Sequence, residues 1–349
     1  MNKKKILLVS DVKGWGGWVR GQYIKKYLSN EFDFDLVDNE GFDMIERKLS
    51  DVFTVNDVKK FTQINNDKEV FLFNKFRNYV NSQKQNIKKY DLIYLLFHTM
   101  LVKKNVKRLM GNVKIITIVT GFPTVKPIFQ NKTNFHKFSK GCEAIGANNL
   151  LSLEDLKKHY NGKTFCATRG VDENIFYPMS SKPKRDNEQL VAAYVGKPIK
   201  EKGLKDIIIP ACREAGVKLI INDRNYTNAL SPNKMREFYN QADFYIVAST
   251  IDGTPNPALE AAACGKPIIS NHIGNMPEFI KNNYNGFIIH KDNGTKINKF
   301  VNFIQNFKND KQKCFEMGMN ARKTILENWT WKKVTESERK IFKEVLNVQ

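Results

Sequence analysis

Short apolar runs alternate along this chain with stretches of helical periodicity, and this alternation constrains the fold more than any other feature. In the first half of the chain the runs are residues 4–9, 92–97, 113–119 and 144–145. In the second half they are residues 190–195, 217–221, 244–247, 267–270 and 287–289. Continuous apolar runs are typical of parallel strands that helices cover on both faces. The pattern therefore predicts an α/β protein with two such sheets.

The segments between the later runs have helical periodicity. Helices are predicted at residues 204–215, 232–241, 257–264, 276–282 and 295–306. Residues 178–187 are rich in proline, serine and charge and lack a hydrophobic period, so they are predicted to link two domains. The length of 349 residues agrees with two domains of ordinary size.

No apolar run reaches the length of a membrane-spanning helix, which is roughly 18 to 20 residues. The basic start of the chain is followed by an apolar run too brief for a signal peptide, so a first strand is predicted there. The five cysteines, at positions 142, 166, 212, 264 and 314, include no Cys-x-x-Cys pair. Buried free thiols in an intracellular protein are therefore expected, with neither a disulfide framework nor a zinc ribbon.

Positive charge is concentrated in one segment. The formal net charge is +21, and residues 70–142 contain fourteen lysines and arginines but one acidic residue, Asp91. A field of this sign attracts phosphate groups, whether on nucleic acid, on anionic lipid headgroups or on a phosphorylated substrate. A lysine-rich solubilising surface is the alternative interpretation.

A glycine-rich turn follows the first predicted strand and precedes a helical pattern. Gly14, Gly16, Gly17 and Gly21 do not have the Gly-x-Gly-x-x-Gly spacing of dinucleotide sites, so a nicotinamide cofactor is not predicted. Glycines do let backbone amides approach an anion, and the helix that follows adds a favourable dipole. We therefore expect Gly16 and Gly17 to contact phosphate.

Two segments of the second half carry the remaining chemistry. Residues 195–203 follow a predicted strand and place Lys197 and Lys202 where both ammonium groups can meet one anion. Asp252 lies in a loop, and Glu260 lies one turn into a helix that begins near Pro257. Carboxylates near a helix N-terminus are suited to binding sugar hydroxyls while the free amides hold phosphate. A capped helix whose carboxylates only balance the dipole is the alternative.

These segments resemble, in order, the motifs of the retaining glycosyltransferases of family 4. Asp252 and Glu260 match the two acidic positions of the Glu-x7-Glu region, and the sequence after them matches the family's helix end and next strand. The other matching segments are Gly16-Gly17, residues 169–178 beginning Arg-Gly-Val-Asp, residues 195–203, residues 239–249, and residues 274–278 with Asn285-Gly286. The resemblance extends over nearly the whole chain.

The resemblance implies the GT-B fold, in which two Rossmann-like domains with parallel sheets face each other across a cleft. We expect an N-terminal acceptor domain over residues 1–180, a C-terminal donor domain over residues 188–330, and a helix over residues 331–349 that packs back on the N-terminal domain. The implied reaction moves a sugar from a nucleoside-diphosphate sugar, most often a UDP-sugar, to a hydroxyl with retention at the anomeric carbon. It requires neither a protein nucleophile nor a metal or other cofactor.

In this scheme charge develops on the departing diphosphate, so pre-placed cations and amides are the useful groups. Lys197, Lys202 and the Gly16-Gly17 amides are the candidates, and Glu260 would hold the ribose hydroxyls. Asp252 would orient the donor sugar. The other predicted donor-binding residues are Gly196, Gly253, Thr254, Pro255 and Asn256.

The sequence departs from the family pattern at three places. Asp252 is one methylene shorter than the usual glutamate, Lys197 replaces an arginine, and the histidine that often follows an N-terminal strand is missing from residues 117–121. The acceptor side is therefore assigned only by position and charge, to His98, Lys126, Lys132 and Lys137. The Asp-x-Asp sequence at residues 33–35 lies in a strand-like stretch and is interpreted as structural.

The acceptor remains open at this point. Synthesis of a cell-surface glycan or glycolipid is favoured, with the basic segment 70–142 resting on an anionic membrane surface; a modified base of DNA is the alternative, bound by the same cations. A sugar-nucleotide-binding partner subunit with weak activity and a sugar-nucleotide epimerase are the hypotheses from other classes. We expect a cytoplasmic location, with peripheral contact at the inner face of the membrane as its variant; the oligomeric state is not predicted.

Overall fold

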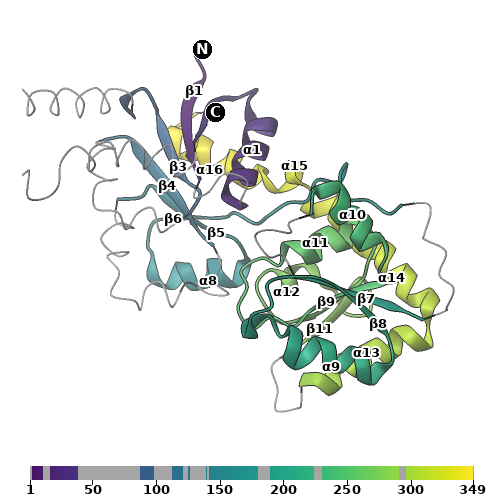
Figure 1. The fold of residues 1–349 in the computed structure, drawn as a ribbon. Coiled ribbons are helices and arrows are strands. Elements are labelled where there is room, and N and C mark those ends of the chain that lie inside the picture. Colours follow the sequence, from purple (N-terminus) through teal and green to yellow (C-terminus); the bar gives the residue numbers. More distant parts are fainter. Residues whose placement is uncertain are drawn as a thin grey trace, which may run out of the picture.

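The computed structural model describes residues 2–10, 16–37, 87–97, 112–120, 125, 139, 141–179, 189–223, 230–290 and 296–348. Within these ranges the chain forms two separate parallel sheets, one of six strands and one of five (Figure 1). The predicted α/β class with two parallel sheets is therefore confirmed. No helix in the described ranges combines the length and the apolar character needed to cross a bilayer.

The N-terminal sheet has the order β2-β1-β3-β4-β5-β6. Its strands are β1 (Lys4–Val9), β2 (Phe32–Val37), β3 (Leu92–Leu95), β4 (Lys114–Val119), β5 (Ala144–Ala147) and β6 (Lys163–Cys166). The helices α1 (Gly16–Leu28) and α8 (Leu150–His159) connect strands of this sheet. In α1, the buried positions Gly21, Ile24 and Leu28 recur every three to four residues and Arg20 adjoins the first of them, which places them on the face that packs on the sheet.

The C-terminal sheet has the order β11-β10-β9-β7-β8. Its strands are β7 (Val191–Val195), β8 (Lys218–Asn222), β9 (Phe244–Val247), β10 (Ile268–Asn271) and β11 (Gly286–Ile289). Its helices are α9 (Ile209–Ala215), α10 (Pro232–Asn240), α11 (Asn256–Ala263), α12 (Met276–Phe279), α13 (Lys296–Asn309) and α14 (Lys311–Thr324). Alternate residues of β7 enter two different cores, with Ala193 in one and Ala192 in the other, so both faces of the sheet are covered.

Two predicted helices differ from the structure. The helix expected at residues 204–215 is divided into a π-helical turn, Leu204–Ile208, and α9, because Pro210 has no amide hydrogen to continue the regular pattern. The helix expected at residues 276–282 ends at Phe279, since the side chains of Asn282 and Asn285 accept hydrogen bonds from backbone amides and thereby favour a turn.

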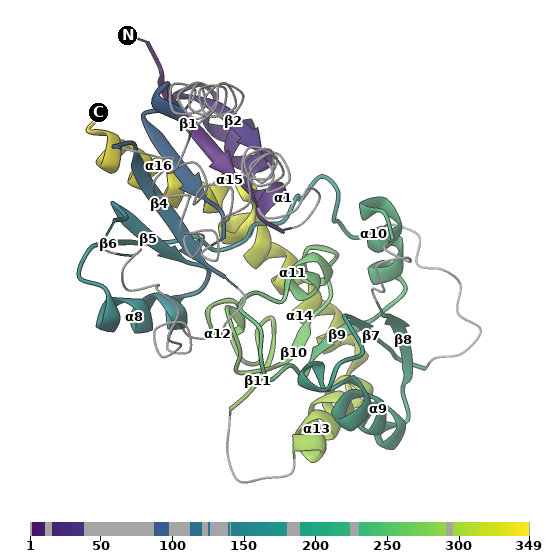
Figure 2. The same cartoon turned by 60° about the vertical axis from the view of Figure 1, so that its left-hand side comes forward.

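The chain crosses between the domains twice, and the two crossings lie side by side. The outgoing segment after β6 pairs with the returning one through Val171 and Thr330. The Val171 amide donates to the Trp329 carbonyl oxygen at 2.9 Å, and the Trp331 amide donates to the Val171 carbonyl oxygen at 3.2 Å. The chain thus returns to the N-terminal domain, where α15 (Trp331–Val334) and α16 (Glu336–Leu346) complete it (Figure 2).

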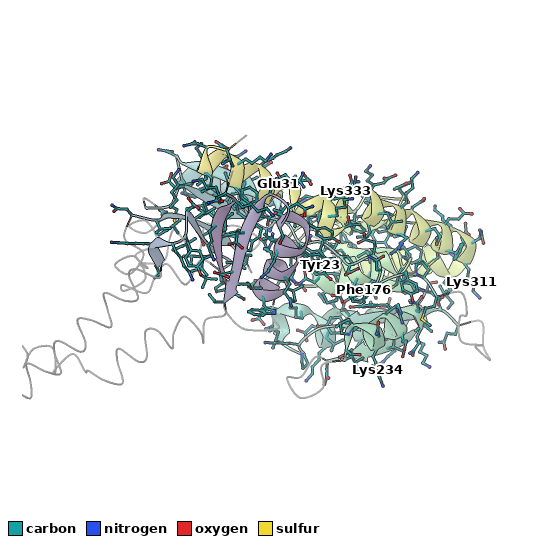
Figure 3. All side chains as sticks on the ribbon, turned by 90° about the horizontal axis from the view of Figure 1, so that it is seen from above. Tyr23, Glu31, Phe176, Lys234, Lys311 and Lys333 are labelled. Atoms are coloured by element: carbon teal, nitrogen blue, oxygen red, sulfur yellow. The ribbon has the colours of Figure 1, made fainter. Side chains whose placement is uncertain are left out.

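Helix α16 packs on the N-terminal sheet. Phe342 is fully buried, and its ring lies 5.6 Å from that of Phe32 and 5.7 Å from that of Tyr94. The buried guanidinium of Arg20 in α1 forms an ion pair with the Glu338 carboxylate. At the surface, Glu31, labelled beside these helices in Figure 3, pairs with two basic side chains of α16. The last helices of the chain are therefore part of the first domain's core.

Most of the linker predicted at residues 178–187 and most of the basic segment 70–142 lie outside the described residues. The Asp-x-Asp sequence falls in β2, where Asp35 accepts a hydrogen bond from the Tyr90 hydroxyl at 2.6 Å and lies 3.4 Å from the Lys5 ammonium group. The hydrogen bond from Tyr90 is the main cause that lowers the pKa of Asp35. These contacts are consistent with a structural role for the Asp-x-Asp sequence in β2, the edge strand of this sheet.

Candidate functional site

The candidate residues of the C-terminal domain lie on loops that follow the carboxyl ends of parallel strands. Residues 196–203 follow β7, and residues 248–255 connect β9 to α11. Carboxyl ends of parallel strands meet at one edge of a sheet, so the two loops are neighbours although some fifty residues separate them. Their contact is direct, because the Thr250 amide donates to the Glu201 carbonyl oxygen at 2.8 Å.

Lys202 and Asp252 form an ion pair between these two loops. The Lys202 ammonium group lies 2.5 Å from the Asp252 carboxylate, and the two side chains are 24% and 17% exposed. A pair so little exposed is screened less by solvent than a surface pair. The structure thus brings together two of the four residues predicted to be catalytic, and it leaves a partly accessible cation beside a carboxylate.

Lys197 belongs to the same loop as Lys202 but is exposed. Its carbonyl oxygen accepts a hydrogen bond from the Tyr194 hydroxyl at 3.1 Å, which holds the loop against the end of β7. A Cβ atom on Gly196 would lie 2.6 Å from that hydroxyl, so a larger residue there would displace the end of the tyrosine side chain. Burial and the Asp252 carboxylate together raise the pKa of Tyr194 to about 12, and its hydroxyl therefore stays protonated.

Glu260 lies in the second turn of α11. Its carboxylate accepts a hydrogen bond from the hydroxyl of Tyr239, which is fully buried in α10, at 2.7 Å. Helix α11 begins at Asn256, with proline in its first turn as predicted. The Oδ1 atom of Asn256 is buried and accepts no hydrogen bond. In the sequence, Tyr239 is the first residue of the matching segment 239–249. The sequence does not predict that its hydroxyl fixes the carboxylate of Glu260.

The loop between β9 and α11 is anchored by the strand beside it. The Asn271 side chain donates to the Ser249 carbonyl oxygen at 3.2 Å. Gly274 has a φ of +54°, and a Cβ atom there would lie 2.5 Å from the Gly253 carbonyl oxygen and 2.8 Å from that of Asp252. Only glycine adopts this conformation at this distance without strain. The backbone of the Asp252-Gly253 pair is thus held in place by a neighbouring glycine.

The N-terminal domain contacts the same loop, which the sequence did not predict. The Asn149 side chain, fully buried, donates to the Gly253 carbonyl oxygen at 3.0 Å. The Asn148 side chain donates to the Thr254 hydroxyl at 3.2 Å, and that hydroxyl lies 3.4 Å from the Asn148 carbonyl oxygen. The Asn-Asn sequence that follows β5 is the signal in the sequence that could have indicated these contacts. These bonds join the two domains at the candidate donor loop.

Glu278 makes a second contact between the domains. The Leu150 amide, at the start of α8, donates to the Glu278 carboxylate at 2.5 Å. Burial is the largest influence on this carboxyl group and raises its pKa to about 7, while the hydrogen bond from Leu150 opposes that change and the charge of Glu154 adds to it. In the sequence, Glu278 ends the matching segment 274–278, which does not by itself indicate a role for this carboxylate.

Gly16 and Gly17 form the first turn of α1, on the N-terminal domain. A Cβ atom on Gly16 would lie 2.1 Å from a guanidinium nitrogen of Arg169, so that side chain packs directly against the glycine. Tyr23, further along α1 and labelled in Figure 3, donates to the Asp172 carboxylate at 2.6 Å and stacks on Trp331. The start of α1 is therefore packed against both interdomain crossings.

The predicted acceptor-side residues are not among those that the structure describes. They are His98, Lys126, Lys132 and Lys137. Among the described residues, no group of three or more histidine, cysteine, aspartate or glutamate side chains is placed to hold a metal ion.

Comparison with known proteins shows similarity to glycosyltransferases. The model of the family described as "Glycosyl transferases group 1" matches residues 211–324. An uncharacterized glycosyltransferase of Methanocaldococcus jannaschii, MJ1178, is 24% identical over 322 residues, which are 78% of this chain and 87% of that protein. The family match and this relative support the group 1 glycosyltransferase superfamily.

Solved structures resemble the whole chain. Sucrose-phosphate synthase from Thermosynechococcus elongatus has a TM-score of 0.71 at 14% identity, over 99% of this chain and all of that one. HepE from Anabaena, solved with UDP and glucose, has a TM-score of 0.70 at 16% identity, over 98% of this chain and all of that one. The GT-B fold implied by the sequence resemblance is confirmed.

Proposed function

We propose that this chain is a retaining glycosyltransferase that transfers a hexose from a UDP-sugar to an acceptor hydroxyl. The ion pair between Lys202 and Asp252 carries the proposal, because it places a cation and a carboxylate at the loop before α11, where Glu260 follows on the same helix. The donor class is supported by HepE, whose structure contains UDP and glucose.

The chain's own groups suit the steps of this reaction. The Lys202 ammonium group would neutralise the charge that develops on the departing diphosphate, with Lys197 and the amides of Gly16 and Gly17 as further donors. Glu260, held by the Tyr239 hydroxyl, would accept hydrogen bonds from the ribose. In the free protein Asp252 partners Lys202; with donor bound, its carboxylate would turn to the sugar hydroxyls while Lys202 meets the phosphate. No step requires a covalent bond to the protein.

Donor binding is the first test. The stability of the protein should rise with UDP or UDP-glucose and not with the GDP or ADP compounds, by roughly 2.7 kcal/mol at a ligand concentration of one hundred times Kd. Lys202→Ala should abolish the increase. Lys205→Ala, which removes an exposed lysine of the adjacent turn, is the matched control and should keep it. If no nucleotide stabilises the protein, the proposal is wrong.

Transfer is the second test. Incubation with UDP-glucose and lipid-linked glycan acceptors should release UDP, and the product should have the anomeric configuration of the donor. We propose a cell-surface glycan or glycolipid as the acceptor, with contact to the inner face of the membrane through the basic segment 70–142. Glucosylation of duplex DNA instead would overturn that choice of acceptor, and binding of UDP-glucose without release of UDP would favour a partner subunit.

A further inference from the structure

At the N-terminal end of α8, one side chain makes two hydrogen bonds, one to its own helix and one to the donor loop of the C-terminal domain. Asn149 caps α8, because its Oδ1 atom accepts a hydrogen bond from the Ser152 amide at 2.7 Å. Its Nδ2 atom donates to the Gly253 carbonyl oxygen at 3.0 Å. The cap fixes the side chain on the N-terminal domain, so the Gly253 carbonyl group is held only while the two domains are together.

Glu278 completes the same junction from the other side. Its carboxylate accepts a hydrogen bond from the Leu150 amide, which follows Asn149 directly. Glu278 is in α12, four residues after Gly274, the glycine that packs against the Gly253 carbonyl oxygen. Asn149 and Glu278 therefore act on one short stretch of backbone from two domains.

We propose that Asn149 and Glu278 form an interdomain latch that positions residues 252–254 for the donor, and that ionisation of Glu278 loosens this latch. This inference rests on the proposed function, since it assigns to both residues a positioning role for the donor of that reaction. Neither side chain needs to touch the donor. The latch would set the fraction of molecules in which the loop is ready to bind it.

The surroundings of Glu278 explain its sensitivity to charge. Glu154 of α8 and the Cys166 thiol of β6 face it from the N-terminal domain. On the other side, Glu278 lines a cavity of about 290 Å³. The titratable side chains that line this cavity with it are Lys281, Tyr284 and Glu327, and the other lining residues are Thr168, Phe279, Thr324, Asn328 and Trp329. The Oγ1 atom of Thr168 is buried there without a hydrogen-bond partner. Burial outweighs the hydrogen bond from Leu150, so in the latched state the pKa of Glu278 is raised and its carboxyl group stays protonated up to a higher pH than in water.

The direction of the pH effect follows from this. With the domains latched, the pKa of Glu278 is about 7, whereas separation from α8 would hydrate the carboxyl group and return its pKa toward the ordinary value of 4.5. The latched state therefore binds the proton more tightly than the open state. Protonation favours the latched state, whose added stability is fully present below pH 4.5 and is lost as the pH rises from about 4.5 to about 7.

The affinity for UDP-glucose as a function of pH tests the latch. This ligand lacks the terminal phosphate that titrates near pH 6, so its own charge stays constant from pH 5.5 to 8.5. Titration calorimetry of the wild-type protein should show about tenfold weaker binding at pH 8.5 than at pH 5.5. In Glu278→Gln the amide oxygen still accepts the Leu150 hydrogen bond but carries no charge, so binding should be tight and independent of pH.

Two further variants test the cause of the profile. Glu154→Gln removes the neighbouring negative charge and should move the midpoint of the wild-type profile to lower pH. Glu316→Gln removes an exposed carboxylate of α14 and should leave the profile unchanged. A Glu278→Gln protein that keeps the wild-type pH profile would overturn the role of Glu278.

Hydrogen exchange in the absence of any ligand tests the latch independently of donor binding. Asn149→Ser keeps a good helix-capping residue but removes the amide that reaches Gly253. Exchange should become faster in peptides that cover residues 148–153 and 249–256, and it should not change in α13. Unchanged exchange at both places would refute the latch. If no variant binds UDP-glucose, the proposed donor is wrong, and exchange alone then decides whether the latch exists.

Discussion

Replacing Gly274 by alanine should damage the donor loop more than it damages the fold. Gly274 has a φ of +54°, and its Cβ position lies 2.5 Å from the Gly253 carbonyl oxygen. Ordinary contact begins near 3.4 Å, so the carbonyl group must move by almost 1 Å. The Asn149 side chain, which donates to that oxygen at 3.0 Å, would then lose its hydrogen bond.

The loss of stability expected for Gly274→Ala has two parts, one from the backbone conformation and one from the contacts. Alanine at Gly216 measures the first part alone. The left-handed conformation costs an alanine about 1–2 kcal/mol, of which roughly 0.4–1 kcal/mol is offset because alanine restricts the unfolded chain. Gly216, with a φ of +66°, carries only this part, since its Cβ would meet just the Lys308 ammonium group, at 3.2 Å. At Gly274 the displaced backbone and the lost hydrogen bond add about 2 kcal/mol, for about 3 kcal/mol in total.

Urea denaturation and titration with UDP-glucose check this together. Both glycines belong to the C-terminal domain, so their effects are read from the same unfolding transition. Gly216→Ala should lose about 1 kcal/mol and bind the donor normally. Gly274→Ala should lose about 3 kcal/mol and bind the donor at least tenfold more weakly. Equal losses of stability with equal affinity would refute the argument that the glycine holds the donor loop.

Three other predictions follow from buried polar groups. Glu338→Ala should cost about 3–5 kcal/mol in urea denaturation, because it leaves the Arg20 guanidinium buried without its partner, whereas Glu338→Leu combined with Arg20→Met should be much less damaging. Tyr239→Phe should cost about 1 kcal/mol by the same measurement and should weaken UDP binding, because the Glu260 carboxylate loses the donor that orients it. Burial raises the pKa of Cys264 to about 12, so a disulfide reagent at pH 8 should modify this thiol only after the protein is unfolded.

Where the sequence predicted the fold well, apolar character alone decided the structure. The strands at residues 4–9 and 244–247 have the predicted bounds. Both faces of each sheet are covered, so the apolar residues of these strands are buried on either face. Strand β6 was not predicted, since Lys163 and Thr164 at the edge of its sheet are polar and partly exposed. The end of the helix at Phe279 depends on asparagine side chains of a later turn, which helical periodicity does not detect.

The placement of the candidate residues could be predicted only where it is local in sequence. The spacing of Asp252 and Glu260 follows from one loop and one helix, and the motif gave it directly. The contacts of Asn149 with Gly253 and of Leu150 with Glu278 join residues more than one hundred positions apart. Such contacts depend on how two independent sheets are docked, and no periodicity within either domain carries that information.

Near α8, single side chains and amides of the N-terminal domain make the hydrogen bonds that reach the donor loop and Glu278 of the C-terminal domain. The two crossings are joined by the short bridge of Val171 with Thr330, and near α8 four hydrogen bonds connect Asn148, Asn149 and Leu150 with the C-terminal domain. At about 1 kcal/mol net for each bond, these contacts favour the closed arrangement by only a few kcal/mol. The pKa of Glu278 is about 7 in place of the ordinary 4.5. Each unit of such a difference is worth about 1.4 kcal/mol, so ionisation of Glu278 changes the balance by an amount comparable with these hydrogen bonds together. In the proposed latch, a change of pH between about 4.5 and 7 is therefore expected to move the equilibrium between the latched and open states.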